Sequence, residues 1–156
     1  MWLRMFDAWM PEMTVDCHVT DGIDFQYNVT YTMEMFANMS PRIVKWQKAF
    51  DKVLTKRMAA LDDPIAPYVL PREDRDLSKG IRAYAATPRF STGYVAIRNR
   101  SGLLIETHSL KPFKQRVAST YRMLVETISY INQKGADLRK AVEAADLETV
   151  DMFRAR

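Results

Sequence analysis

A short apolar run in the second half of the chain constrains the fold most. Leu103–Ile105 lies between Ser101-Gly102 and the sequence Glu106-Thr107-His108. An apolar run bounded by turn signals is typical of a buried strand, and Lys111-Pro112 then predicts the start of a helix. Glu106 therefore follows a buried strand, where a carboxylate is costly unless it is paired, hydrated or used for chemistry. On spacing alone, the simplest interpretation is a glutamate that faces solvent or an arginine.

The rest of the chain alternates between strand and helix patterns. We expect helices over 2–10, 41–60 and 112–134, an amphipathic stretch over 138–150, and strands over 13–17, 93–98 and 103–105. The segment 25–31 suits a strand or an extended loop, and 81–86 is compatible with a further strand. The proline-rich segment 61–80 reads as a surface excursion. Strands that alternate with long helices predict an α/β fold, a mixed sheet packed by helices.

Three further expectations concern the turn after the strand over 93–98, the end of the long helix and the face of that helix that is buried. Asn99–Gly102 is predicted to turn between two strands, and Gly135 is predicted to end the long helix, because glycine is the usual residue after a helix C-terminus. Helical spacing predicts that one set of apolar residues faces inward on that helix: Phe113, Val117, Tyr121, Leu124, Ile128 and Ile131.

Composition excludes several classes of protein. The 156 residues predict one domain, and a 47% hydrophobic and 27% charged content is ordinary for a globular chain. The net charge of +4 comes from scattered residues, so we predict no nucleic-acid partner. The single cysteine, Cys17, excludes an internal disulfide framework and a multi-cysteine metal site. No apolar run has the length of a membrane span. The N-terminal residues lack a signal-peptide pattern, and the compartment stays open.

A second stretch adds to this interpretation. Val15–Gly22 reads V-D-C-H-V-T-D-G, and Leu103–Pro112 reads L-L-I-E-T-H-S-L-K-P. Together they resemble the zinc carboxypeptidases, the carboxypeptidase A-like metallopeptidases. The large bacterial members carry similar D-x-H-V-T-D-G and L-L-x-E-x-H-x-L-K-P segments. The resemblance runs from about Trp9 to about Tyr130.

The resemblance implies roles for two residues. Enzymes of this family hold one zinc with two histidines and a glutamate, and His18 matches the third ligand. Glu106 matches the general base, which takes a proton from the attacking water. If both serve one zinc-bound water, the imidazole nitrogen and the carboxylate lie at most roughly 7 Å apart. His108 would share the strand face of Glu106, either as a supporting partner or as a plain helix-entry residue.

Other parts of the family's site have more than one candidate in this chain or have none. The family also uses a tyrosine on a mobile loop, and both Tyr84 and Tyr94 are in range. Asn99-Arg100 imitates the family's carboxylate clamp, but it follows His18 instead of preceding it, so the role is not carried over. The chain contains no His-x-x-Glu, so the set of zinc ligands is incomplete. Residues 1–156 therefore resemble one segment, the C-terminal half of a catalytic domain, with an exposed sheet edge that predicts self-association.

The function implied is that of a fragment of a zinc metallocarboxypeptidase, inactive alone, whose parent hydrolyses C-terminal peptide bonds. Two alternatives stay open. Within the same superfamily, the parent is an acylase that acts on N-acyl amino acids. From a different class, the chain is a non-catalytic interaction module that kept the fold.

Overall fold

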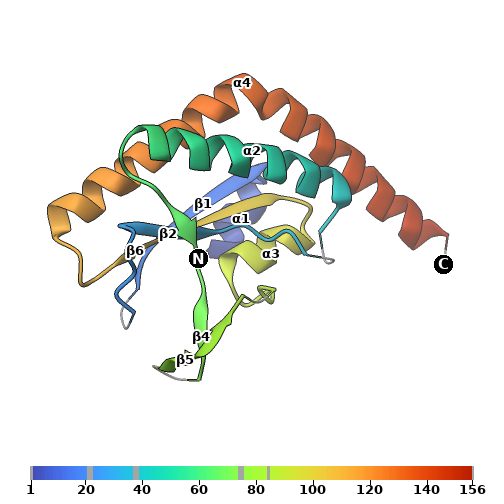
Figure 1. Cartoon of the computed structure of the whole chain (residues 1–156). Helices are drawn as coiled ribbons and strands as arrows, with labels where there is room; N and C mark the ends of the chain where they lie inside the picture. Colours follow the sequence, from blue (N-terminus) through green and yellow to red (C-terminus); the bar gives the residue numbers. More distant parts are fainter. Residues whose placement is uncertain (1, 21–22, 37–38, 74–75, 84, 156) are drawn as a thin grey trace.

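A computed structural model describes residues 2–20, 23–36, 39–73, 76–83 and 85–155. The chain forms a mixed sheet packed by helices (Figure 1), which confirms the predicted α/β class. Its elements follow in this order: α1 (Trp2–Trp9), β1 (Met13–Thr20), β2 (Val29–Thr32), α2 (Pro41–Ala60), β3 (Ala66–Pro67), β4 (Leu70–Glu73), β5 (Asp76–Arg82), α3 (Ser91–Ile97), β6 (Ser101–His108) and α4 (Phe113–Arg154).

The main sheet has the strand order β1-β6-β2-β3. Strand β6 pairs parallel with β1 and antiparallel with β2, so Leu103–Ile105 lies inside the sheet as predicted. Helix α4 packs against one face of β6, and α3 packs against the other face near Gly102, so the apolar run of β6 is continuous instead of alternating. Among the described strands, β1 has a neighbour on one side only, and the sheet therefore has the open edge that the sequence predicted.

Helices α2 and α4 form one layer against the sheet, along the top of Figure 1. The Ser40 hydroxyl accepts a hydrogen bond from the Arg42 amide, and Pro41 occupies the first turn, so α2 begins where the sequence predicts. The core lies between this layer and β6 and includes Phe50, Leu103, Ile105 and Met123, all fully buried.

Helix α4 does not end at Gly135, contrary to the prediction. It continues for 42 residues, from Phe113 to Arg154. Tertiary contacts on both sides of the glycine explain the continuation. The Trp46 indole donates a hydrogen bond to the Lys134 carbonyl at 2.9 Å, and Leu138 is buried one turn later. Packing against α2 therefore outweighs the helix-breaking preference of glycine, which is about 1 kcal/mol.

The predicted inner face of α4 is wrong for most of its residues, although Leu124 is partly buried against the core. Phe113, Tyr121 and Ile128 are 71%, 67% and 57% exposed. The buried face of this part of the helix instead contains Ser119, Met123, Thr127 and Tyr130. The buried Thr127 hydroxyl is satisfied because it donates a hydrogen bond to the Met123 carbonyl within the helix. Helical spacing identified an apolar stripe, but the packing partners decided which stripe faces the core.

The predicted strand over 93–98 is a helix, α3. This helix packs closely on the start of β6. A Cβ atom on Gly102 would lie 2.7 Å from a Val95 methyl group, so β6 needs glycine at this position to let α3 pack on the sheet. Ser101 and Gly102 are thus the first residues of β6 and not part of a turn. Asn99 makes the turn, with a positive φ of 54°.

The segment 61–82 contains more structure than predicted. Strand β3 extends the main sheet, and β4 and β5 form a separate two-stranded sheet that projects from the body in Figure 1. Strand β5 ends at Arg82, so the strand predicted over 81–86 overlaps only the last two residues of β5. None of the helices described here is long and apolar enough to cross a membrane.

Candidate functional site

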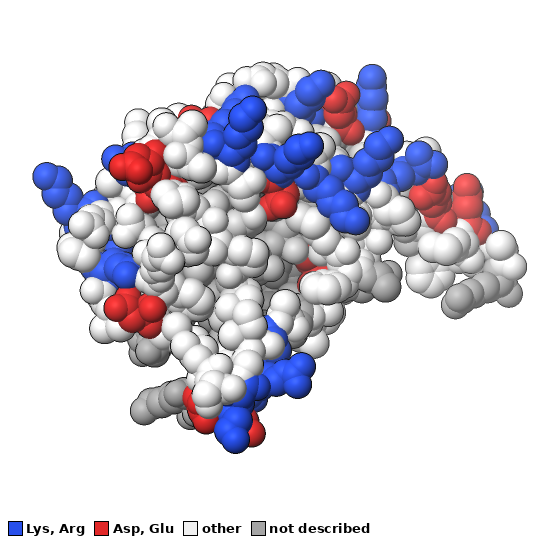
Figure 2. Space-filling view, in the orientation of Figure 1, with Lys and Arg blue, Asp and Glu red and all other residues white. Residues whose placement is uncertain are grey.

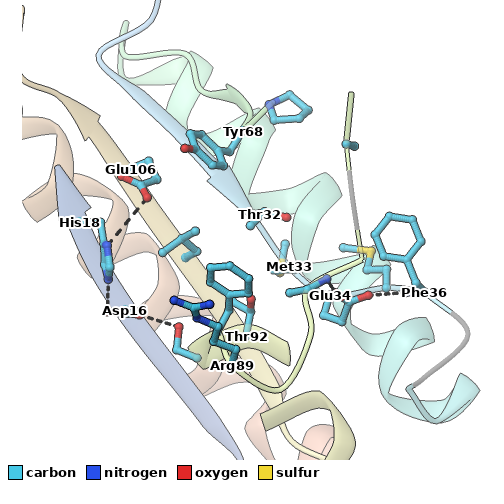
Figure 3. A pocket seen from close by; sticks show the side chains of 17 residues that line it. Asp16, His18, Thr32, Met33, Glu34, Phe36, Tyr68, Arg89, Thr92 and Glu106 are labelled. Carbon is cyan, nitrogen blue, oxygen red and sulfur yellow. Dashed lines mark hydrogen bonds and ion pairs between the residues drawn. The ribbon is translucent and has the colours of Figure 1, made fainter. Parts of the chain in front are cut away.

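The parallel pairing of β1 and β6 brings the two predicted site residues together. His18 lies opposite Glu106 in the strand register. Their side chains point to the same face of the sheet, and His18 Nδ1 lies 3.9 Å from Glu106 Oε1 (Figure 3). This separation is well inside the limit of roughly 7 Å for two groups that act on one water. Both side chains lie near the C-terminal ends of their strands, where open α/β sheets commonly build sites.

Asp16 is a third member of this cluster that the sequence analysis missed. Its Oδ1 lies 3.0 Å from His18 Nε2, and its Oδ2 accepts a hydrogen bond from the Ser91 hydroxyl at 2.5 Å. The alternation of side chains along a strand places residues 16 and 18 on one face, so the spacing Asp-x-His could have identified it. Asp16 holds the imidazole in place and links β1 to the start of α3.

Glu106 is a buried carboxylate, 7% exposed, and not the solvent-facing glutamate that spacing alone suggested. Its Oε2 has no hydrogen-bond partner among the described residues. Burial raises the pKa of Glu106 above its usual value, and the nearby Asp16 carboxylate raises it further, while His18 opposes the shift. A carboxylate with a raised pKa is a stronger base than one in water.

Glu106 and His18 open into a cavity of about 540 Å³ (Figure 3). Its apolar walls include Met33, Met35, Phe36, Phe90 and Leu104. Three carboxylates line it, Asp16, Glu34 and Glu106. Glu34 is buried and accepts hydrogen bonds from the backbone amides of Phe36 and Ala86. Arg89 is the cavity's one arginine or lysine among the described residues.

His108 shares the strand face of Glu106, as predicted, but it lies outside this cavity. Its ring is 1% exposed and stacks on Phe25, with 4.6 Å between ring centroids. Neither ring nitrogen has a hydrogen-bond partner among the described residues. Burial lowers the pKa of His108, and Lys111 lowers it further while Asp24 opposes the shift. His108 is therefore a neutral packing residue behind the site.

The two candidate tyrosines do not complete the site. Tyr84 lies outside the described residues. Tyr94 belongs to α3, where its ring packs edge-on against Phe6 at 5.4 Å and its hydroxyl accepts a hydrogen bond from Arg98. It does not line the cavity that holds Glu106, whereas Tyr68 does. Tyr68 follows β3, a strand that the sequence patterns did not predict.

Asn99 and Arg100 have a structural role and do not bind a substrate carboxylate at the cavity. Both bind Asp146 on α4, at 3.1 Å and 3.0 Å. They precede β6, while Glu106 lies near its far end, so they are at the opposite end of the strand from the site.

The described residues do not make a complete metal site. They contain no group of three histidine, cysteine or carboxylate side chains arranged to hold a metal ion. A catalytic zinc needs about three protein ligands, and here only His18 matches one. Comparisons with models of protein families, with curated proteins and with solved structures found no match to this chain.

The burial of Glu106 gives a pH-dependent prediction. Because its pKa is raised on folding, the folded state binds this proton more tightly than the unfolded state. The resulting stability is present below the ordinary value of 4.5 and is lost as the pH rises through the raised value. Glu106→Gln, which cannot ionise, should therefore raise the free energy of unfolding more at pH 7.5 than at pH 4. Urea unfolding of the wild type and the variant at both pH values checks this, and a difference between the two proteins that is the same at both pH values would contradict it.

Proposed function

We propose that this chain carries the general base and one metal ligand of a zinc metallocarboxypeptidase site. Glu106 is the base and His18 is the ligand. The observation that carries the proposal is the register of β1 and β6, which puts the two side chains 3.9 Å apart on one face of the sheet. The same residues lie in the two segments that resemble the family. The substrate of the parent protein would be a peptide, cleaved at its C-terminal bond.

The surroundings of the pair support this chemistry. A general base works best when its pKa approaches the working pH, and burial shifts Glu106 in that direction. Asp16 binds one nitrogen of His18, which fixes the tautomer and orientation of the ring. The adjoining apolar cavity would hold a substrate side chain and exclude water around the carboxylate.

Zinc would polarise a substrate carbonyl and acidify a bound water. The described residues do not supply enough ligands for that, so the proposal requires further ligands from residues beyond this set. Taken alone, this chain should bind zinc weakly and should have no peptidase activity.

A zinc titration followed by NMR tests the assignment of His18. The chain has two histidines, and the buried His108 is the internal control. We expect zinc to bind with a dissociation constant well above micromolar, because one imidazole is far from a full ligand set. The imidazole signals of His18 should shift and those of His108 should not.

His18→Gln should remove the zinc response, while His108→Gln should leave it intact. Stoichiometric binding tighter than micromolar would show that more ligands are present than proposed. A titration that leaves His18 unperturbed, or a response that survives His18→Gln, would contradict the assignment.

One observation favours a second candidate function, a non-catalytic interaction module. The described residues lack a three-donor metal group, so the fold can serve binding without hydrolysis. The open edge of β1 and exposed apolar side chains on α4, such as Phe113 and Tyr121, support the self-association predicted from the sequence. The amidohydrolase alternative has no observation that favours it over peptide cleavage.

A further inference from the structure

The cavity beside Glu106 is acidic, and its carboxylates have no basic partner. Asp16, Glu34 and Glu106 all line it, and none of them forms an ion pair with a lysine or arginine in the described part of the chain. Elsewhere the buried Asp63 is paired with Arg122 at 2.9 Å, the usual arrangement for a buried charge. The cavity therefore holds negative charge that the protein itself does not neutralise.

The basic side chains of the molecule lie elsewhere. Arg89 lines the cavity, but it is an exposed residue in the turn before α3. Figure 2 shows a row of Lys and Arg side chains over the layer of α2 and α4. Strand alternation places Glu106 on the opposite face of β6 from Ile105, which packs in the core beneath that layer. The lysines of α2 are therefore on the other side of the sheet from the cavity.

Two buried hydrogen-bond acceptors on this face have no partner among the described residues. Glu106 is 7% exposed and its Oε2 is unpaired, and Thr30 is fully buried with its Oγ1 unpaired. Thr30 lies opposite Glu106 in the antiparallel register of β2 and β6, so the two side chains share one face of the sheet. Thr32, on the same face of β2, lines the cavity. A buried polar atom without a partner is costly, so this end of the cavity favours a ligand that donates hydrogen bonds.

We propose that, in the absence of metal, this cavity binds a primary amine as its alkylammonium ion. The ammonium group would donate hydrogen bonds to Glu106 and Thr30. Its apolar stem would lie against the cavity walls formed by Met33, Phe36 and Leu104. This inference goes beyond the proposed function, because it needs neither zinc nor peptide cleavage.

The lining favours an organic cation over the other classes of small ligand. The described residues contain no group of three donors that could hold a metal ion, and the apolar walls offer nothing to a hydrated ion. An anion would meet three carboxylates and only the exposed Arg89. An ammonium group is compact and carries three hydrogen-bond donors and no acceptor, which complements a site rich in acceptors. Asp16 and Glu34 add to the attraction through their charge.

The test is an NMR titration of the metal-free 156-residue chain with hexylamine at pH 7.5. Backbone amide shifts measure the dissociation constant, which we expect to be on the order of 1 mM for so small a ligand. Hexanol and hexanoate carry the same stem with a neutral or a negative end. Both should bind at least about tenfold more weakly, because they lack the charge-assisted hydrogen bond to Glu106.

Variants locate the bound amine. Glu106→Gln keeps the shape of the side chain and removes its charge, and it should weaken hexylamine binding about tenfold. The loss would not reflect unfolding, because this variant is expected to be more stable than the wild type at pH 7.5. Thr30→Val removes only the hydroxyl group and should weaken binding about threefold.

Glu143→Gln is the matched control, because Glu143 is an exposed residue of α4 that does not line the cavity. It removes the same charge as Glu106→Gln and should change the dissociation constant less than twofold. A comparison with Nα-acetyl-lysine methylamide separates two sources of an alkylammonium group. Tighter binding of this compound would identify a lysine side chain as the ligand, and tighter binding of hexylamine would identify a free amine.

Several results would overturn the proposal. Hexanol or hexanoate binding as tightly as hexylamine would show that the cavity does not select a cation. Full affinity in Glu106→Gln, or an equal loss in Glu143→Gln, would show that the amine does not bind at Glu106. Absence of saturable binding would also refute the site. The assay contains no metal, so its failure leaves the zinc test on His18 unaffected, and a failed zinc titration leaves amine binding unaffected.

Discussion

Replacing Phe50 with alanine should lower the free energy of unfolding by about 3–5 kcal/mol, the usual cost of removing a fully buried phenylalanine. Phe50 is 0% exposed and connects the two helices of the upper layer. Its ring centroid lies 5.4 Å from that of Trp46 on α2 and 5.0 Å from that of Tyr130 on α4. The substitution would leave a cavity at the contact between α2 and α4.

Urea unfolding monitored by circular dichroism measures this loss. Phe153→Ala is the matched control, because it makes the same change on α4 at a side chain that is 76% exposed. It should change stability by less than about 0.5 kcal/mol. Equal effects of the two substitutions would contradict the described packing of α2 against α4.

Gly93→Ala should destabilise the chain by about 3 kcal/mol, at the upper end for overpacking a buried site. An added Cβ would lie 2.2 Å from the Thr87 carbonyl oxygen and 2.4 Å from that of Ala86. Both atoms belong to the backbone, so neither can move aside like the end of a flexible side chain. Helix α3 would shift, and the hydrogen bond from Ser91 to Asp16 beside His18 would be strained.

Gly135→Ala is the control for the change of glycine to alanine itself. In α4 the nearest atom to the added Cβ is a methyl group of Ile131, at 3.3 Å, and alanine is the better helix former. We expect this substitution to raise the free energy of unfolding by up to about 1 kcal/mol, provided that Ile131 shifts slightly. A Gly93→Ala variant as stable as the wild type would contradict the close contact of α3 with the Ala86 and Thr87 backbone.

The sequence predicted those parts of the site that depend on local pattern. The apolar run of Leu103–Ile105 identified the central strand, and strand alternation placed Glu106 and His108 on one face. The two resembling segments nominated His18 and Glu106, which the structure brings together although 88 positions separate them. Candidate site residues near the ends of strands can be recognised in a sequence, because such a site needs particular residue types at fixed spacings.

The sequence patterns missed the walls of the site. Asp16 lies on β1, Arg89 in the turn before α3 and Tyr68 in the loop after β3, and the three meet only through the strand order and the position of α3. Periodicity within one segment cannot predict contacts between segments that lie far apart in the chain.

The sequence by itself determined the α/β class, the start and end of α2, and the central position of β6, because propensity, capping and apolar period all act within a few residues. The tertiary structure alone decided that 91–97 is a helix, that α4 continues through Gly135, and that its polar Ser119 and Thr127 face inward. Each of these depends on contacts between segments far apart in the chain. Such contacts outweigh local preferences of about 1 kcal/mol per residue, because packing an element into a core involves several kcal/mol.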